Sequence, residues 1–201
     1  MVFGRDGLWT SFAAYLIGLH EEADSHIAML WDNSLEGRIP HEVSIITGHG
    51  EEQNYEVSGI SGIRTRYMSI DSTPLWVVAQ GYKQVWSGHP ADRPAVVKAL
   101  SFLRSLDKDG DGLIENTFSD GLIGWPEKWA SSRDGACIEI NAWYIEALKA
   151  SGFLLNMHPQ GIKRIQESFD ENFLSNDDPY FFDSLCSGKR RKIISPMGSV
   201  P

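Results

Sequence analysis

Between Leu8 and Leu19 the spacing of apolar residues predicts a helix that is apolar on nearly every side. Such a helix has to be covered all round, because apolar surface of that extent is unfavourable in water. The segment Cys137–Leu148 repeats the pattern with two apolar stripes. We therefore expect two enclosed helices, which restricts the fold to one in which other elements surround them.

Further segments predict helices that are apolar on one side only. They are Ala23–Asp32, Leu75–Trp86, Val96–Leu106 and Ile162–Phe173. Before the second of them, Asp71 is a candidate cap and Pro74 suits a first helical turn. Inner and outer rings of helices produce such an alternation of enclosed and one-sided helices. The chain is thus expected to be all-α and to form one domain over 1–201, with residues 175–201 as a poorly ordered tail.

The charge balance argues against two classes of partner. Asp and Glu number 27 against 18 Lys and Arg, so the formal net charge of −9 does not attract nucleic acid or anionic lipid. The basic run 189–192 is interpreted as solvated surface. Hydrophobic stretches such as 12–19 are too short to span a bilayer. We expect a cytoplasmic protein with neither a nucleic-acid nor a membrane partner.

Polar residues that could form a site are concentrated in two long segments, 35–70 and 107–136, and at the starts of helices. Carboxylates and arginines hydrogen-bond neighbouring hydroxyls, and tryptophan faces stack on pyranose rings, so this mixture predicts a carbohydrate site. The candidate substrate-binding residues are Arg5, Asp6, Trp9, Arg38, His41, Glu42, Asp71, Trp125 and Glu139. Two of them have an alternative interpretation: Asp71 as a helix cap and Glu139 as part of a structural bond in an enclosed helix.

Glycoside hydrolysis needs a protonated carboxylic acid beside the leaving oxygen, and usually a second carboxylate that activates water or attacks the sugar. Glu127 is the candidate acid, because Trp125 and Trp129 flank it and desolvation by aromatic rings raises the pKa of a carboxyl group. The same spacing fits an acidic residue in the first turn of a helix.

Asp107, Asp109 and Asp111, followed by Gly112, match the start of a calcium-binding loop. The twelfth position of that loop is Phe118, where an EF-hand has glutamate. We therefore favour a turn between helices and expect no cofactor. A calcium site of different geometry that uses Glu115 is the alternative.

Five motifs in order give the chain a resemblance to a known family. They are FGRDGLWTS at 3–11, GRIPHE at 37–42, SIDSTPLW at 69–76, DGDGLIE at 109–115 and EINAWY at 139–144. Over residues 3 to about 155 the chain resembles the amylo-α-1,6-glucosidase, or glycogen-debranching, family. That family belongs to the glucoamylase-like and trehalase-like hydrolases that fold as (α/α)6 toroids, so the resemblance implies this fold.

The resemblance also implies roles for particular residues. Arg5 and Asp6 look like the pair that holds the hydroxyls of the terminal sugar, and Glu127 looks like the general acid. Debranching enzymes commonly have aspartate at the acid position, so the glutamate here is a departure. The helix that Asp71 begins would line the site.

The resemblance further predicts what is missing. The catalytic base of these enzymes is a glutamate far downstream of the acid, and no segment here matches it. We therefore expect an incomplete toroid that lacks the base, has the other half of the barrel as a partner, and associates or is inactive alone. The predicted function is hydrolysis of α-glucosidic bonds in glycogen-like or small glucans with inversion. The alternatives are a trehalase-like hydrolase of another sugar and a non-catalytic carbohydrate-binding relic.

Overall fold

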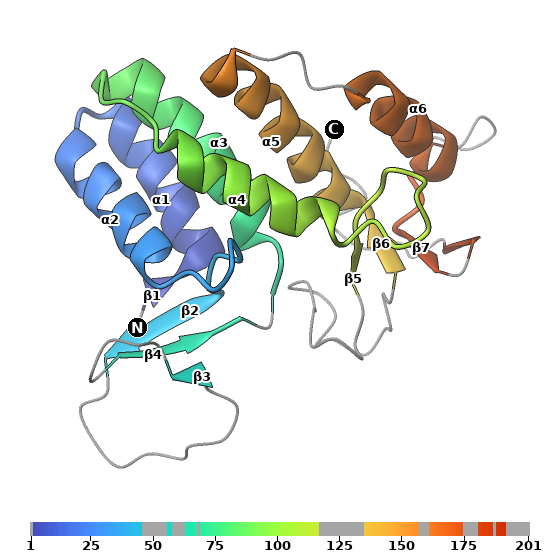
Figure 1. Cartoon of the computed structure of the whole chain (residues 1–201), viewed down its shortest axis with the longest axis horizontal. Coiled ribbons are helices and arrows are strands. Elements are labelled where there is room, and N and C mark those ends of the chain that lie inside the picture. Colours follow the sequence, from blue (N-terminus) through green and yellow to red (C-terminus); the bar gives the residue numbers. More distant parts are fainter. Residues whose placement is uncertain are drawn as a thin grey trace.

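The computed structural model describes residues 2–45, 56–57, 63–67, 69–116, 135–156, 161–174, 181–186 and 188–191. Within these ranges six α-helices form a layer, and two small antiparallel sheets lie along one edge of it (Figure 1). The chain is therefore a mixed α/β protein. The expected all-α fold, an incomplete (α/α)6 toroid, is wrong.

The helices themselves follow the apolar periodicity of the sequence. They are α1 (Gly4–Leu16), α2 (His20–Asp32), α3 (Ser72–Tyr82), α4 (Arg93–Arg104), α5 (Ile138–Leu155) and α6 (Ile162–Phe173). A short π-helix, η1 (Lys83–Ser87), continues α3. The six predicted helices are thus confirmed, with ends shifted by up to four residues, except that α5 continues seven residues beyond the predicted end at Leu148. Helix α4 begins with a side-chain cap, because Asp92 accepts a hydrogen bond of 3.0 Å from the Ala95 N–H.

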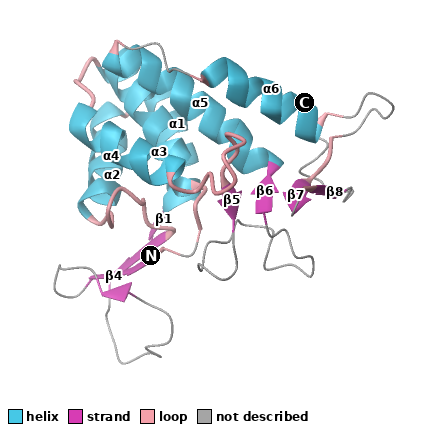
Figure 2. Cartoon of the chain, turned by 45° about the vertical axis from the view of Figure 1, so that its right-hand side comes forward, coloured by secondary structure: helices cyan, strands magenta, loops and turns pink. Residues whose placement is uncertain are grey.

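Each sheet consists of short antiparallel strands, which Figure 2 separates from the helices by colour. The first has the order β1-β2-β4-β3 and comprises β1 (Val2–Phe3), β2 (Glu42–Ile45), β3 (Glu56–Val57) and β4 (Ile63–Arg66). The second has the order β5-β6-β7-β8 and comprises β5 (Glu115–Asn116), β6 (Gly135–Cys137), β7 (Ser184–Cys186) and β8 (Lys189–Arg191). The segment expected as a tail therefore contributes two strands.

The strands were not predicted because they are short. They contain two to four residues each, which is too few to display the alternation that identifies a strand. Their stability comes from pairing with distant segments, as when Glu42 lies opposite Arg66. The long segments that were interpreted as loops therefore contribute strands to both sheets.

The main core lies between α1, α2 and α3 and continues to α4 and α5. Trp76 of α3 is fully buried, donates its indole N–H to the Ile27 carbonyl at 2.9 Å, and stacks on Trp31 with ring centroids 5.0 Å apart. Helix α1 was expected to be enclosed on all sides. Instead Trp9 is 52% exposed and Leu16 is 61% exposed, so one side of α1 lies at the surface. None of the helices in the described ranges is long and apolar enough to cross a membrane.

Gly4 determines how closely α1 approaches α3. A Cβ atom at this position would overlap the Pro40 carbonyl oxygen and the Ser72 side chain. The Gly4 N–H also donates to the His41 carbonyl at 2.8 Å, which attaches the start of α1 to the segment before β2. The N-terminal ends of α1 and α3 therefore meet, and they bring Arg5 to Asp71.

We predict that Gly4→Ala lowers the free energy of unfolding by about 1–3 kcal/mol, the usual cost of overpacking a closely packed site. Gly81→Ala is the matched control within α3, because its added Cβ would lie 3.6 Å from the Ala150 Cβ of α5, an ordinary van der Waals contact. This control should be neutral or stabilise by up to about 1 kcal/mol. Urea unfolding followed by circular dichroism measures both variants. Equal stability of Gly4→Ala and wild type would contradict the close approach.

Candidate functional site

Arg5 connects two carboxylates at the junction of α1 and α3. Its Nη1 donates to Asp71 Oδ2 at 2.9 Å and its Nε donates to Asp6 Oδ1 at 3.0 Å. The side chain of Asp71 is 2% exposed, whereas that of Asp6 is 61% exposed. The guanidinium group thus bridges a buried anion and an anion at the surface.

Asp71 is held by hydroxyl groups as well. Its Oδ1 accepts hydrogen bonds from Ser69 Oγ and, at 3.4 Å, from Ser72 Oγ. Asp71 occupies the N-cap position of α3, but its side chain makes no capping hydrogen bond. The alternative interpretation of Asp71 as a helix cap is therefore wrong, because Arg5 and the two serines take its oxygens.

Three other candidate residues lie in and before β2, where protein groups engage them. Glu42 is buried; its Oε1 accepts from Ser44 Oγ at 2.8 Å and its Oε2 lies 3.7 Å from Arg66 Nη1. The Arg38 guanidinium lies 5.8 Å from the centre of the Tyr67 ring. The His41 ring meets Phe3 edge-on with centroids 5.8 Å apart. Arg38, His41 and Glu42 therefore contact residues in the first sheet or next to it.

Trp9 and Asp6 present an aromatic ring and a carboxylate on the same side of α1. They are three residues apart on the helix, so they are neighbours on its surface. The Trp9 ring is oriented by an edge-on contact with Phe12, with centroids 5.3 Å apart. Arg5, Asp6 and Trp9 therefore form a small polar and aromatic surface, which we call the α1 surface.

Three candidates remain, Glu139, Glu127 and Trp125. Glu139 is half-buried in the first turn of α5. Glu127 and Trp125 lie outside the described residues. Sequence reasoning missed Ser69 and Arg66, which orient Asp71 and Glu42. The motif SIDS contains Ser69 beside Asp71 and could have pointed to it, whereas Arg66 required knowledge of the strand register.

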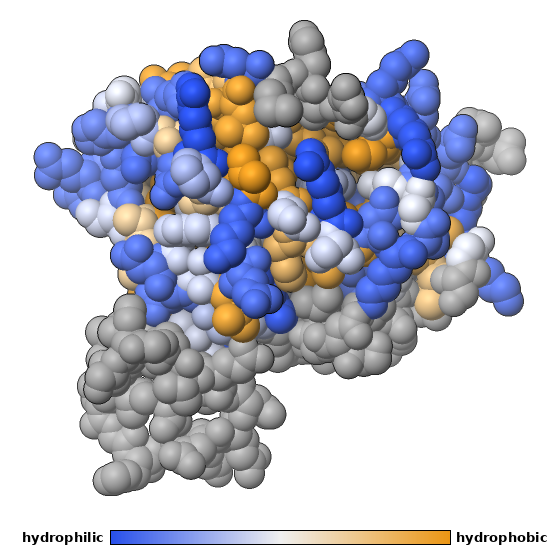
Figure 3. Space-filling model, in the orientation of Figure 1, coloured by the Kyte–Doolittle hydropathy of each residue, from blue (hydrophilic) through white to orange (hydrophobic). Residues whose placement is uncertain are grey.

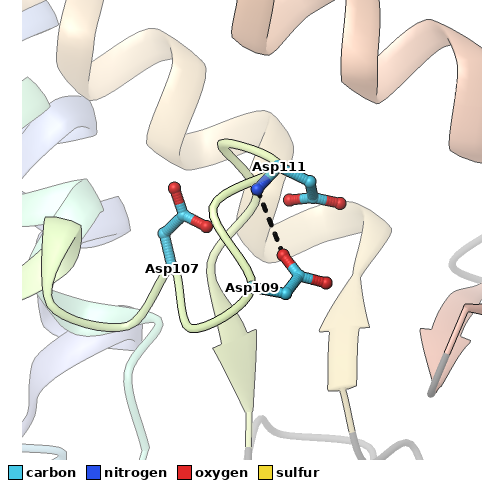
Figure 4. A group of neighbouring side chains, drawn as sticks. All are labelled: Asp107, Asp109 and Asp111. Atoms are coloured by element: carbon cyan, nitrogen blue, oxygen red, sulfur yellow. Dashed lines mark hydrogen bonds between the residues drawn. The ribbon is translucent and has the colours of Figure 1, made fainter.

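The aspartates at 107, 109 and 111 gather in the turn that joins α4 to β5 (Figure 4). One carboxylate oxygen of each lies within 4.8 Å of the other two. Backbone N–H groups donate to all three: Gly110 to Asp107 at 2.9 Å, Asp111 to Asp109 at 3.1 Å and Leu113 to Asp111 at 2.7 Å. These bonds support the interpretation as a turn, although the turn leads into a strand and not into a helix.

The electrostatics of this turn raise the pKa values of two carboxyl groups, those of Asp111 and Glu115. Partial burial, together with the charges of Asp109 and Asp107, raises the pKa of Asp111 above its ordinary value. The pKa of Glu115 is raised by the same causes, burial first, even though its Oε2 accepts from the Lys108 N–H at 2.8 Å. These two groups therefore bind protons more readily in the folded state than in the unfolded chain, so their ionisation at neutral pH lowers the stability of the fold.

We predict that Asp109→Asn raises the melting temperature at pH 7. The substitution removes a charge that raises both pKa values, while the amide oxygen can still accept from the Asp111 N–H. Because a raised pKa means that stability is gained as pH falls towards the ordinary carboxylate range, the difference from wild type should shrink on acidification. Scanning calorimetry between pH 7 and about pH 4 measures it.

Two results would contradict this account of the turn. One is a lower melting temperature for Asp109→Asn at pH 7. The other is stabilisation of wild type, but not of Asp109→Asn, by about 1 mM calcium at constant ionic strength, which would identify a cation site.

Comparison of the sequence with protein-family models and with curated proteins found no match. A function therefore has to be argued from the residues of this chain. The α1 surface, with the buried Asp71 behind it, is the arrangement with the most specific chemistry in the described part of the chain.

Proposed function

We propose that the α1 surface binds the terminal glucose unit of a glycogen-like or small glucan, and that the chain takes part in hydrolysing its α-glucosidic bonds. The observation that carries this proposal is the Arg5 bridge between Asp6 and Asp71. The five sequence motifs that resemble the amylo-α-1,6-glucosidase family support the choice of sugar. A cytoplasmic location belongs to the same proposal.

The charges favour a neutral ligand. The single positive charge of Arg5 faces the two carboxylates of Asp6 and Asp71, so the site carries a net negative charge that repels phosphate and carboxylate groups. Sugar hydroxyls are neutral and can donate to a carboxylate and accept from a guanidinium in one arrangement. An uncharged sugar therefore suits this surface better than an anionic one.

The geometry also suits a pyranose ring. Arg5 donates a hydrogen bond to the Asp6 carboxylate and so fixes its orientation. The remaining acceptor positions of Asp6 therefore face solvent before a ligand binds. Trp9, one turn further along α1, is half exposed and offers a flat apolar face. A sugar ring whose hydroxyls meet Asp6 could stack on that face.

Hydrolysis requires an acid in addition to this binding surface, and we assign that role to Glu127. In an inverting mechanism the acid protonates the glycosidic oxygen while a second carboxylate activates a water molecule on the opposite face of the sugar. Asp71 does not suit the second role, because it is buried and tied to Arg5 and Ser69. That observation favours sugar binding without catalysis as the second candidate function.

Asp6→Asn and Trp9→Ala test binding. We expect each to weaken the affinity for maltotriose by about ten-fold or more, since one removes a charged acceptor and the other a stacking face. Glu21→Gln is the control for the first, as Glu21 is an exposed acid in the first turn of α2. Trp86→Ala is the control for the second, as Trp86 is 46% exposed in η1, beyond the far end of α3 from Asp71. Isothermal titration in which all four variants matched wild type would exclude the α1 surface.

Glu127→Gln separates catalysis from binding. We expect it to keep maltotriose affinity and to lower turnover of an unactivated glucan by about two to four orders of magnitude, the usual effect of losing a general acid. Arg5→Ala should weaken binding and turnover together, because its contacts are made before and during reaction. Undiminished hydrolysis by Glu127→Gln would exclude it as the acid. Tight binding without hydrolysis by wild type would support the second candidate.

A further inference from the structure

One side of α5 remains at the surface between two apolar grooves. One groove lies towards α3 and η1 and is lined by Val78, Tyr82, Val85, Trp86 and Phe153. The other lies towards α6 and is lined by Trp143 and Phe169. Each groove has a volume of about 310 Å³. The segment of α5 between them runs through Ala142, Glu146, Lys149 and Phe153, and we call it the α5 stripe.

Large apolar side chains are exposed on the α5 stripe and its borders. Phe153 is 54% exposed, and Val85 and Trp86 are 63% and 46% exposed. Figure 3 shows hydrophobic surface gathering over the upper part of the helical layer, near the ends of α3 and α5, with hydrophilic residues around it. Contiguous exposed apolar surface with a polar rim marks an interaction site.

The η1 side of the first groove is fixed by hydrogen bonds within η1 and to α2. The π-helix η1 ends at Ser87, whose Oγ donates to the Lys83 carbonyl at 2.7 Å. Beyond it, His89 Nδ1 lies 2.5 Å from Asp24 Oδ2 on α2. These contacts fix the turn that carries Val85 and Trp86, so the groove is formed before any partner binds.

The spacing along the α5 stripe is that of a helix that packs against another helix. Positions 142, 146, 149 and 153 follow each other at intervals of four, three and four residues, so they lie on one face of α5 that a second helix could contact along its length. Glu146 and Lys149 lie at the centre of the stripe, form an ion pair of 2.6 Å, and remain about half exposed. The centre of this surface therefore carries one charge of each sign.

We propose that the α5 stripe is the interface of a homodimer, in which α5 packs antiparallel to α5 of a second copy. A two-fold axis that passes α5 between Ala147 and Leu148 places Glu146 opposite Lys149 of the second copy, and Lys149 opposite its Glu146. The same pair of opposite charges then occurs twice across the interface, as an isologous interface requires.

The same axis matches the sizes of the neighbouring residues. Ala142 comes to lie opposite Phe153 of the second copy, and Phe153 opposite its Ala142. Each such pair joins a small residue to a large aromatic one, which lets two helices interlock. A partner of different sequence would require neither this symmetry of charge nor this symmetry of size. The second copy is therefore the occupant that the α5 stripe fits.

Charge reversal tests this interface. We expect wild type to show a monomer–dimer equilibrium in sedimentation velocity at protein concentrations up to about 100 µM. Glu146→Lys or Lys149→Glu alone sets like charges opposite each other twice and should weaken the dimer by about ten-fold or more. The double variant, Glu146→Lys with Lys149→Glu, restores both opposite pairs and should return the dissociation constant to within about three-fold of wild type.

Lys163 and Glu167 provide the matched control. They form an exposed ion pair of 3.6 Å on α6, so reversing Lys163 alone, or exchanging the two charges, should leave association unchanged. Thermal melts followed by circular dichroism check that every variant folds. A wild type that stays monomeric over this range would overturn the proposal. So would single reversals that leave the dimer intact, or an exchange that fails to restore it.

Discussion

The rest of the structure depends on the ion pair of Arg5 with Asp71, which joins the start of α1 to the start of α3. Both residues lie where α1 and α3 begin, and Gly4 allows the two helices to approach closely enough for the 2.9 Å ion pair to form. Asp71 is almost completely buried, so Arg5 and the neighbouring serine hydroxyls have to compensate its charge. The first sheet, attached through His41 and Gly4, then fixes the direction of α1.

How much the sequence predicts depends on whether a feature is local. Each of the six helices carries its own apolar period, so each could be located before the structure was known. Arg5 and Asp71, which lie 66 positions apart, were both assigned to one substrate site from the family motifs, and their side chains do meet. The sheets were not predicted, because two to four residues carry no readable alternation and pairs such as Glu42 with Arg66 depend on distant strands.

The exposed residues of α1 and α5, the two helices expected to be enclosed, show a second limit of prediction from sequence. An apolar residue predicts that covering it is favourable, but the sequence does not specify what covers it. Leu16 of α1 and Phe153 of α5 are both more than half exposed. On α5 the exposed Phe153 lies on the same face as the ion pair of Glu146 and Lys149. This face therefore combines an exposed aromatic residue with one charge of each sign.

The central claim is that a terminal glucose unit binds at Arg5, Asp6 and Trp9. It is tested most directly by following the indole N–H signals of the seven tryptophans by NMR during titration with maltotriose, with Trp9 assigned from a Trp9→Phe variant. The account predicts a saturable shift of the Trp9 signal and of the Arg5 Nε–H signal, with the Trp86 signal unmoved. Saturable binding that shifts other indole signals and leaves those of Trp9 and Arg5 unchanged would contradict it.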